Sequence, residues 1–448
     1  MSDSHRKWLM QLLNLEGLVY LALLPLVMFA TPTRALVLLL VPLLWLVRKV
    51  TTGRWTLITP LDWPVRLLVV MVLVSLWVSF DFAFSFPRVV AVLYGLALIY
   101  ALAWFSSRSA RHLGGSVLLF LLMGLSIAGL SLFGTLWSTK FGPLAPLISR
   151  LPHLISLPGA DEGFQANQVA GVLLWVTPVA VALGYTAILG RKTVTGDFLQ
   201  RHTIRLALLG MTGVMGLVLL LAQSRGGWIG FAAAIILLLM LALHRRPWLA
   251  WAVPLVTVGL IALTINVIGV ERMERLLFDF RSESSEAALE SLSIRQEVWV
   301  RGWYAVQDFP LTGMGMNTFR RVVPVLYPFM ALSGVEDIAH AHNQFLQAAL
   351  DVGIPGLIGY VGMWLVAAAM LWQSWRQSND VWVRTLVAGF AAALLSYFIY
   401  GLTDAVAFGA KPGFLFWYLF GLIAGLHEWV ANRQHVAIDP SASSGQAG

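Results

Sequence analysis

The sequence has no cysteine, and few of its 448 residues are charged. The absence of cysteine excludes disulfide bonds, thiolate metal sites and cysteine nucleophiles. Asp, Glu, Lys and Arg make up 12% of the chain, whereas a typical soluble domain has about 25% charged residues. A globule of this length cannot cover its surface with so few charges. A protein embedded in lipid does not need to, because hydrocarbon replaces water around its outer faces.

Long apolar runs are what the chain has instead: 58% of its residues are hydrophobic, and its mean hydropathy is +0.78. Since a helix needs about 20 mainly apolar residues to cross a bilayer, we predict an all-α polytopic membrane protein of about 12 transmembrane helices. The first run has no small-residue cleavage pattern, so we expect a membrane span there and not a signal peptide. The predicted spans are residues 13–30, 35–48, 66–83, 88–106, 116–137, 168–190, 205–222, 227–244, 248–270, 345–373, 384–402 and 413–431.

Basic residues indicate how the helices are oriented. Cytoplasmic connections between spans are enriched in Lys and Arg, and most basic residues of the short connections fall on the side of the N-terminus. We therefore expect a multi-pass protein of the cytoplasmic (inner) membrane with both termini in the cytoplasm. Membrane anchoring accounts for the net charge of +8, so we expect no nucleic-acid partner. The basic residues in the short outer connections are Arg34, Arg88, Arg225 and Lys411.

Two connections on the predicted outer side are long, residues 137–167 and 272–344. The second is too long for a simple connector, and it contains helix-like runs such as Ser293 to Val306. We expect it to form a helical subdomain on the outer face. The predicted division of the chain is residues 1–270 with helices one to nine, residues 271–344 as the large loop, residues 345–434 with the last three helices, and residues 435–448 as a disordered cytoplasmic tail.

Two histidines, His340 and His342, directly precede the tenth predicted span. Histidine can accept a proton near neutral pH, so one of them could activate a hydroxyl group. Two other interpretations remain open at this point. The pair could bond only to its own loop, or it could bind a metal ion, for which His-x-His spacing alone is a weak signal.

Two arginines on the same side are candidate anion ligands. Arg225 lies in the sequence Gln-Ser-Arg-Gly-Gly-Trp, where it either extends to lipid headgroups or binds a phosphate that the glycine N–H groups approach closely. Arg295 and Trp299 are four residues apart on a predicted helix, so they share a face. A guanidinium beside an indole suits a phosphate–sugar ligand, and an amphipathic helix resting on the membrane is the alternative.

Three further polar residues lie in outer connections. Asn167 precedes the sixth predicted span, where its amide could bind sugar hydroxyls, although capping of the helix would explain it without function. Asp404 and Lys411 lie in the last outer connection. A mutual salt bridge would explain both of them without function.

Together these segments resemble a known family. His342-Asn343, followed after nine residues by Gly353-Ile354-Pro355-Gly356, is similar to the signature of the O-antigen ligases and the related O-antigen polymerase superfamily. The segment from Arg295 to Gly315 resembles the region that precedes this signature, and Ser224-Arg225-Gly226 resembles the family's arginine motif at the membrane edge. The order, spacing and common side of these motifs make the joint match more specific than any one of them.

The resemblance implies a GT-C-like membrane glycosyltransferase of lipopolysaccharide biosynthesis in the cell envelope. The family transfers a glycan from undecaprenyl pyrophosphate to an acceptor hydroxyl, such as one on lipid A–core, with inversion and without a metal ion or other cofactor. The implied partners are this donor, a glycan or lipid acceptor and the bilayer, with no obligatory protein partner. Carried onto this sequence, His342 is the general base, Arg225 and Arg295 hold the donor pyrophosphate, and the supporting or substrate-binding candidates are His340, Asn343, Trp299 and Asn167.

Other functions remain compatible with the sequence. An O-antigen polymerase joins lipid-linked units to each other, and a protein O-oligosaccharyltransferase of the same superfamily glycosylates Ser or Thr. Members of the second group often carry an extra C-terminal region, and this sequence ends soon after its last predicted span. A polysaccharide or lipid transporter is the alternative from another class. It predicts ionisable residues deep within the spans, whereas Arg225, Arg295 and His342 are expected at one face.

Overall fold

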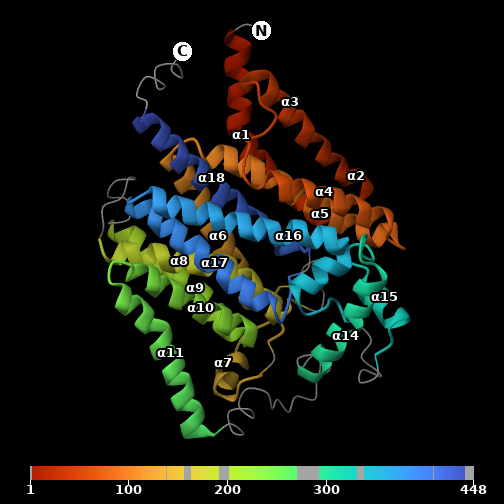
Figure 1. The fold of residues 1–448 in the computed structure, drawn as a ribbon, viewed down its shortest axis with the longest axis vertical. Helices are drawn as coiled ribbons and strands as arrows, with labels where there is room; N and C mark the ends of the chain where they lie inside the picture. The colour runs from red at the N-terminus through yellow and green to blue at the C-terminus, as the bar shows by residue number, and fades with distance from the viewer. Residues whose placement is uncertain are drawn as a thin grey trace.

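The computed structural model describes residues 3–137, 139–155, 163–190, 201–269, 292–329, 338–406 and 408–438. Within these residues the chain is helical, and its only β contact is an isolated bridge between Thr135 and Phe164. Ten described helices are long and apolar enough to cross a membrane. The prediction of an all-α, polytopic membrane protein is therefore confirmed (Figure 1).

Each predicted span falls on a helix. Two of the twelve predicted spans are not among the ten candidate membrane helices: α4 has 16 residues, and the apolar part of α1 is Val19–Met28. The helices are α1 (Asp3–Met28), α3 (Leu40–Thr52), α4 (Asp62–Trp77), α5 (Phe82–Ser106), α6 (Ala110–Gly134), α8 (Ala166–Ile188), α9 (His202–Leu221), α10 (Arg225–Ala242), α11 (Pro247–Ile268), α16 (Gln344–Gln377), α17 (Val381–Gly401) and α18 (Phe414–Ile438).

Several predicted boundaries are shifted by a few residues, and two of these shifts have clear local reasons. Helix α5 begins six residues earlier than predicted, because the Asp81 side chain accepts a hydrogen bond from Phe84 N and caps the helix ahead of Pro87. The second span extends over Pro32–Thr52 and includes the short helix α2 (Pro32–Ala35) and the 3-10 turn η1 (Leu36–Leu39) before α3. The turn precedes Pro42, which has no N–H to donate to the carbonyl of Leu38.

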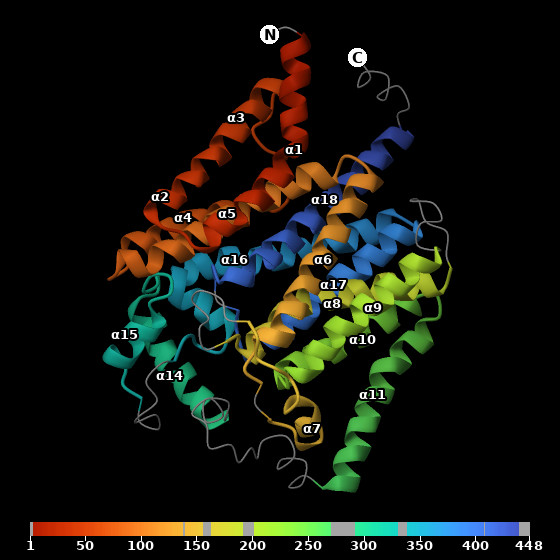
Figure 2. The ribbon, with the colours of Figure 1, turned by 180° about the vertical axis from the view of Figure 1, so that it is seen from behind.

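The most buried helices form the centre of the bundle. Helix α8 packs along α17, α5 along α18, and α16 along α4, while α10 covers another face of α17. Helix α11 contacts α10 and diverges from the other helices (Figures 1 and 2). The short elements η2 (Gly142–Leu144), α7 (Ala145–Ile148), α14 (Leu292–Asp308) and α15 (Phe319–Leu326) all lie at one end of the bundle (Figure 2).

The described part of the large loop contains two helices, α14 and α15. Val298 of α14 and Phe319 of α15 belong to one small core, to which Ile338 of the loop and Leu350 of α16 also contribute. The disordered tail was predicted to begin at residue 435, but α18 continues to Ile438, so the first four residues of the predicted tail are helical. The polar, acidic segment 282–290 and residues 439–448 lie outside the described residues.

A break in α16 fixes this loop to the bundle. Gly353 has φ +71°, and the backbone of Gly313 lies so close that a Cβ on Gly353 would be 2.9 Å from Gly313 N. Two backbone hydrogen bonds cross the contact: Met314 N donates to Leu350 O and Ile354 N to Pro310 O, each at 2.7 Å. Glycine is needed here for its positive φ and its missing side chain. Part of the sequence motif therefore has a structural role, since it anchors the segment after α14 beside the first turns of α16.

Candidate active site

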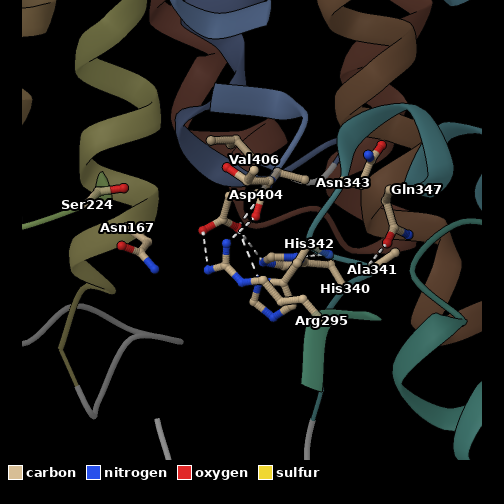
Figure 3. A network of polar contacts seen from close by, with 12 residues as sticks. Asn167, Ser224, Arg295, His340, Ala341, His342, Asn343, Gln347, Asp404 and Val406 are labelled. Atoms are coloured by element: carbon tan, nitrogen blue, oxygen red, sulfur yellow. Dashed lines mark hydrogen bonds and ion pairs between the residues drawn. The ribbon is translucent and has the colours of Figure 1, made fainter. Parts of the chain in front are cut away.

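A single carboxylate, Asp404, joins three of the side chains selected from the sequence. Asp404 follows α17, Arg295 lies in the first turn of α14, and His340 and His342 lie in the loop before α16 (Figure 3). The Asp404 oxygens are 3.4 Å from His342 Nδ1, 3.8 Å from His340 Nε2 and 3.9 Å from Arg295 Nη2. Arg295 Nη1 also donates to Thr403 O at 2.6 Å. The arrangement places a cation and two imidazoles around one buried anion.

The two histidines differ in the nitrogen that each leaves available. His340 Nδ1 accepts a hydrogen bond from the backbone N–H of His342 at 3.2 Å, which assigns its hydrogen to Nε2, facing Asp404. Burial above all, and then the neighbouring His342, lowers the pKa of His340 to about 3, so His340 is neutral at pH 7. His342 directs Nδ1 to Asp404 and so retains Nε2 as a proton acceptor. Of the two, His342 has the geometry of a base oriented by a carboxylate.

Asp404 stays ionised in this setting. Burial on its own raises the pKa of the Asp404 carboxyl, but the contact with His342 and the charge of Arg295 outweigh it and hold the pKa below its usual value. The carboxylate can therefore stabilise a positive charge that develops on His342 when its ring takes a proton. Its 3.4 Å contact is longer than an ideal hydrogen bond, as is common at sites without substrate.

A small pocket opens beside Asp404. It holds about 260 Å³ of empty space. Among its lining residues, Arg225 is the first residue of α10, and Ser224 caps this helix by accepting a hydrogen bond from Gly227 N. A helix N-terminus carries partial positive charge, so it favours an anion together with the arginines. The lining residues are Asn167, Gln223, Ser224, Arg225, Gly226, Arg295, Thr403 and Asp404.

Gln223 connects the pocket to the first long loop. Its side-chain oxygen accepts hydrogen bonds from Lys140 N at 2.8 Å and Phe141 N at 2.5 Å. Gln223 is also one of three non-glycine residues with positive φ among those described, the others being Asn317 and His342. Such backbone conformations cost about 1–3 kcal/mol each and concentrate at functional sites. Both Gln223 and His342 are next to Asp404: Gln223 lines the same pocket, and His342 contacts the carboxylate.

Several sequence interpretations change here. Asn167 does not cap α8, whose N-cap is Gln165 without a side-chain bond; Asn167 lines the pocket instead. Asn343 is the N-cap of α16, accepting from Phe345 N and Leu346 N and donating to Leu402 O. Trp299 is partly buried against the core of α14 and α15 and is not among the lining residues of the described pocket. Gly226 lies against Thr403, where a Cβ would be 2.8 Å from Oγ1, so it allows close packing of α10 on α17.

The residue whose importance the sequence understated is Asp404. A salt bridge with Lys411 was one explanation for it, but its contacts include Arg295, His340 and His342, and the Lys411 ammonium lies 4.2 Å from the centre of the Phe29 ring. Its only signal in the sequence is an acidic residue directly after a long apolar run. Thr403 also lines the pocket and was not selected from the sequence, whereas Gln223 lies in the selected Arg225 motif but had no role assigned to it.

His340, His342 and Asp404 could also hold a metal ion, because one ligand atom from each lies within 4.8 Å of the others. Two arguments favour a metal-free cluster around the ion pair of Asp404 with Arg295 instead. Arg295 already places a cation 3.9 Å from the same carboxylate. In addition, the hydrogen assigned to His340 Nε2 occupies the position that a metal would need.

Comparison with known proteins agrees with the motifs. Residues 210–361 match the model of a family described as O-antigen ligase, which confirms the resemblance seen in the sequence. The matched segment is roughly one third of the chain and includes Arg225, Arg295 and His342, but not Asp404. No curated protein matches the chain. The match and the membrane helices together support a membrane glycosyltransferase of the O-antigen ligase or polymerase type.

Proposed function

We propose that this protein transfers a glycan from a lipid pyrophosphate carrier, undecaprenyl pyrophosphate, to the hydroxyl group of an acceptor such as lipid A–core. The observation that carries the proposal is the position of Asp404, which contacts both His342 and Arg295 and also lines the pocket that holds Arg225. A base for the acceptor and cations for the leaving group thus lie within one connected cluster.

The chemistry follows from these positions. His342 Nε2 takes the proton of the acceptor hydroxyl, and the acceptor oxygen attacks the anomeric carbon of the donor glycan. The bond from this carbon to the pyrophosphate oxygen breaks, and its electron pair stays on the lipid pyrophosphate. In-line attack inverts the anomeric configuration. Asp404 stabilises the imidazolium that forms, and no metal ion is required.

Arg225 and Arg295 act on the leaving group. Both line the pocket at the N-terminus of α10, and guanidinium groups bind phosphate oxygens by paired hydrogen bonds. Arg295 Nε is buried and without a hydrogen-bond partner in the described structure, and a phosphate oxygen would satisfy it. Charge that develops on the departing pyrophosphate is then neutralised in a site already arranged for it.

The location in the membrane is part of the proposal. With the N-terminus in the cytoplasm of a cell with an inner membrane, the site lies on the extracytoplasmic side, where residues 137–167 and 272–344 form the two long connections. A donor with a polyprenyl chain stays in the bilayer, so a site at the bundle end lets its pyrophosphate reach the arginines.

An acceptor panel tests the function directly. Purified protein is incubated with undecaprenyl-pyrophosphate glycan and one of three acceptors: lipid A–core, a second lipid-linked unit or a pilin-like protein. Transfer to lipid A–core is the expected result. Transfer only to the second unit would instead assign a polymerase, and transfer to protein an oligosaccharyltransferase. Movement of the lipid-linked glycan across vesicle membranes without transfer would assign a transporter.

Arg225→Ala is expected to reduce transfer by about 10²–10³-fold, the usual cost of removing one preorganised charge stabiliser. Arg225→Lys keeps the charge but not the planar fork, so we expect it to recover only part of the rate. Steady-state rates at saturating donor measure the effect. Arg34→Ala is a matched control, since this arginine donates to Phe29 O in another connection. Equal losses from both substitutions would contradict a role at the donor.

Metal removal separates the two interpretations of the His340–His342–Asp404 cluster. We expect EDTA to leave the transfer rate unchanged, because in this mechanism Arg225 and Arg295 neutralise the leaving pyrophosphate, as a metal ion would in a metal-dependent enzyme. Loss of activity with EDTA and its recovery with Zn²⁺ would overturn the metal-free mechanism and make the three residues ligands.

A further inference from the structure

Behind the histidine loop lies a chain of buried hydrogen bonds with no part in the steps above. Gln347 Oε1 accepts a hydrogen bond from Ala341 N, the amide between the two histidines, at 2.8 Å (Figure 3). Gln347 Nε2 donates to Asp351 Oδ1 at 2.9 Å, and the same oxygen accepts from Asn317 N at 3.2 Å. Gln347 and Asp351 are 3% and 2% exposed, so both bonds are shielded from water.

The chain joins three parts of the fold. Gln347 and Asp351 lie one turn apart on α16, and Asn317 belongs to the segment that is anchored at the break in this helix. Arg88 on α5 lies near enough for its charge to act on both Asp351 and His340. An acidic residue inside a span is costly unless it has partners, and each partner here comes from an element next to the site.

The contact on Ala341 N matters because His342 is strained. His342 has φ +48°, a conformation that needs support from its surroundings. Its own N–H is held by His340 Nδ1, and the preceding N–H is held by Gln347. Loss of the Gln347 contact frees the backbone to relax, and the His342 ring then turns away from Asp404.

We propose that Gln347 and Asp351 are positioning residues, which fix the backbone of the histidine loop and so aim His342 at the acceptor hydroxyl. The inference rests on the proposed function for its kinetic consequence alone. The structural consequence, protection of the Ala341 amide, holds whatever reaction the protein catalyses.

Exchanging the amide and the carboxylate between these two positions tests the proposal. In Gln347→Glu two carboxylates face each other across the 2.9 Å contact, and we expect kcat to fall by about 10²-fold, the cost of a small misplacement of a reacting group. The KM for the donor should not change, since the arginines are untouched. Asp351→Asn keeps an acceptor oxygen and should cost less. The double variant restores a donor and an acceptor with the original net charge, so we expect it to recover most of kcat.

Hydrogen exchange provides the readout that needs no substrate. The Ala341 amide should exchange faster in Gln347→Glu and in Gln347→Leu than in the wild type. Adding Asp351→Asn should restore its protection in Gln347→Glu but not in Gln347→Leu. The proposal would be overturned if exchange of the Ala341 amide were unchanged in both Gln347→Glu and Gln347→Leu. It would also be overturned if the loss of kcat in Gln347→Glu were matched by an equal rise in the KM for the donor. A wild-type protein that transfers no glycan would contradict the proposed function, while the exchange result would still decide the positioning role.

Discussion

Replacing His342 by alanine is expected to lower the rate of glycan transfer by about 10²–10⁴-fold, the range that general-base catalysis contributes. His342 is the histidine that leaves Nε2 available, because its Nδ1 faces Asp404 while both nitrogens of His340 are engaged. An alcohol is a poor nucleophile unless its proton is removed as it attacks. The loss should therefore appear in kcat at saturating donor and acceptor.

His340→Asn is the matched control, because its side-chain oxygen can still accept the N–H of His342. We expect a smaller loss from it than from His342→Ala. Thermal unfolding of both variants must resemble that of the wild type for the comparison to hold. Normal transfer by His342→Ala would contradict the mechanism, and a larger effect from His340→Asn would move the base to His340.

The apolar runs predicted the helices well because lipid imposes one simple condition, a long unbroken segment with satisfied backbone bonds. The predicted boundaries failed where a side chain decided the ends. Asp81 caps α5, so the helix begins at Phe82, six residues before the predicted start. Local hydrogen bonds of this kind are invisible to a search for hydrophobic length.

The candidate site was predictable in part. Arg225, Arg295 and His342 lie in motifs, which can be recognised from the sequence alone. Asp404 is different, since it meets Arg295 across 109 positions of chain only after α14 and α17 pack at the same end of the bundle. The spacing of the motif from His342 to Gly356 also does not show which of its residues act on the substrate and which only stabilise the fold. Asn343 and Gly353 prove to be a helix cap and a close backbone contact.

Asp404→Asn is expected to reduce transfer by about as much as the loss of the base itself, roughly 10²–10⁴-fold, because His342 loses both its orientation and the stabilisation of its charge. The substitution keeps the shape of the side chain but removes a charge that is 5% exposed beside Arg295. Breaking a buried pair by removing one partner typically costs about 3–5 kcal/mol, so the unfolding temperature should fall as well.

Two further variants separate chemistry from stability at Asp404. Arg295→Gln combined with Asp404→Asn removes both charges, so stability should recover relative to Asp404→Asn while transfer remains low, since neither the leaving group nor His342 regains support. Lys411→Met tests the structural explanation suggested by the sequence. If Asp404 served only to form a salt bridge with Lys411, Asp404→Asn and Lys411→Met would reduce transfer equally. We expect Lys411→Met to retain transfer, because the cluster of Asp404 with Arg295, His340 and His342 stays intact.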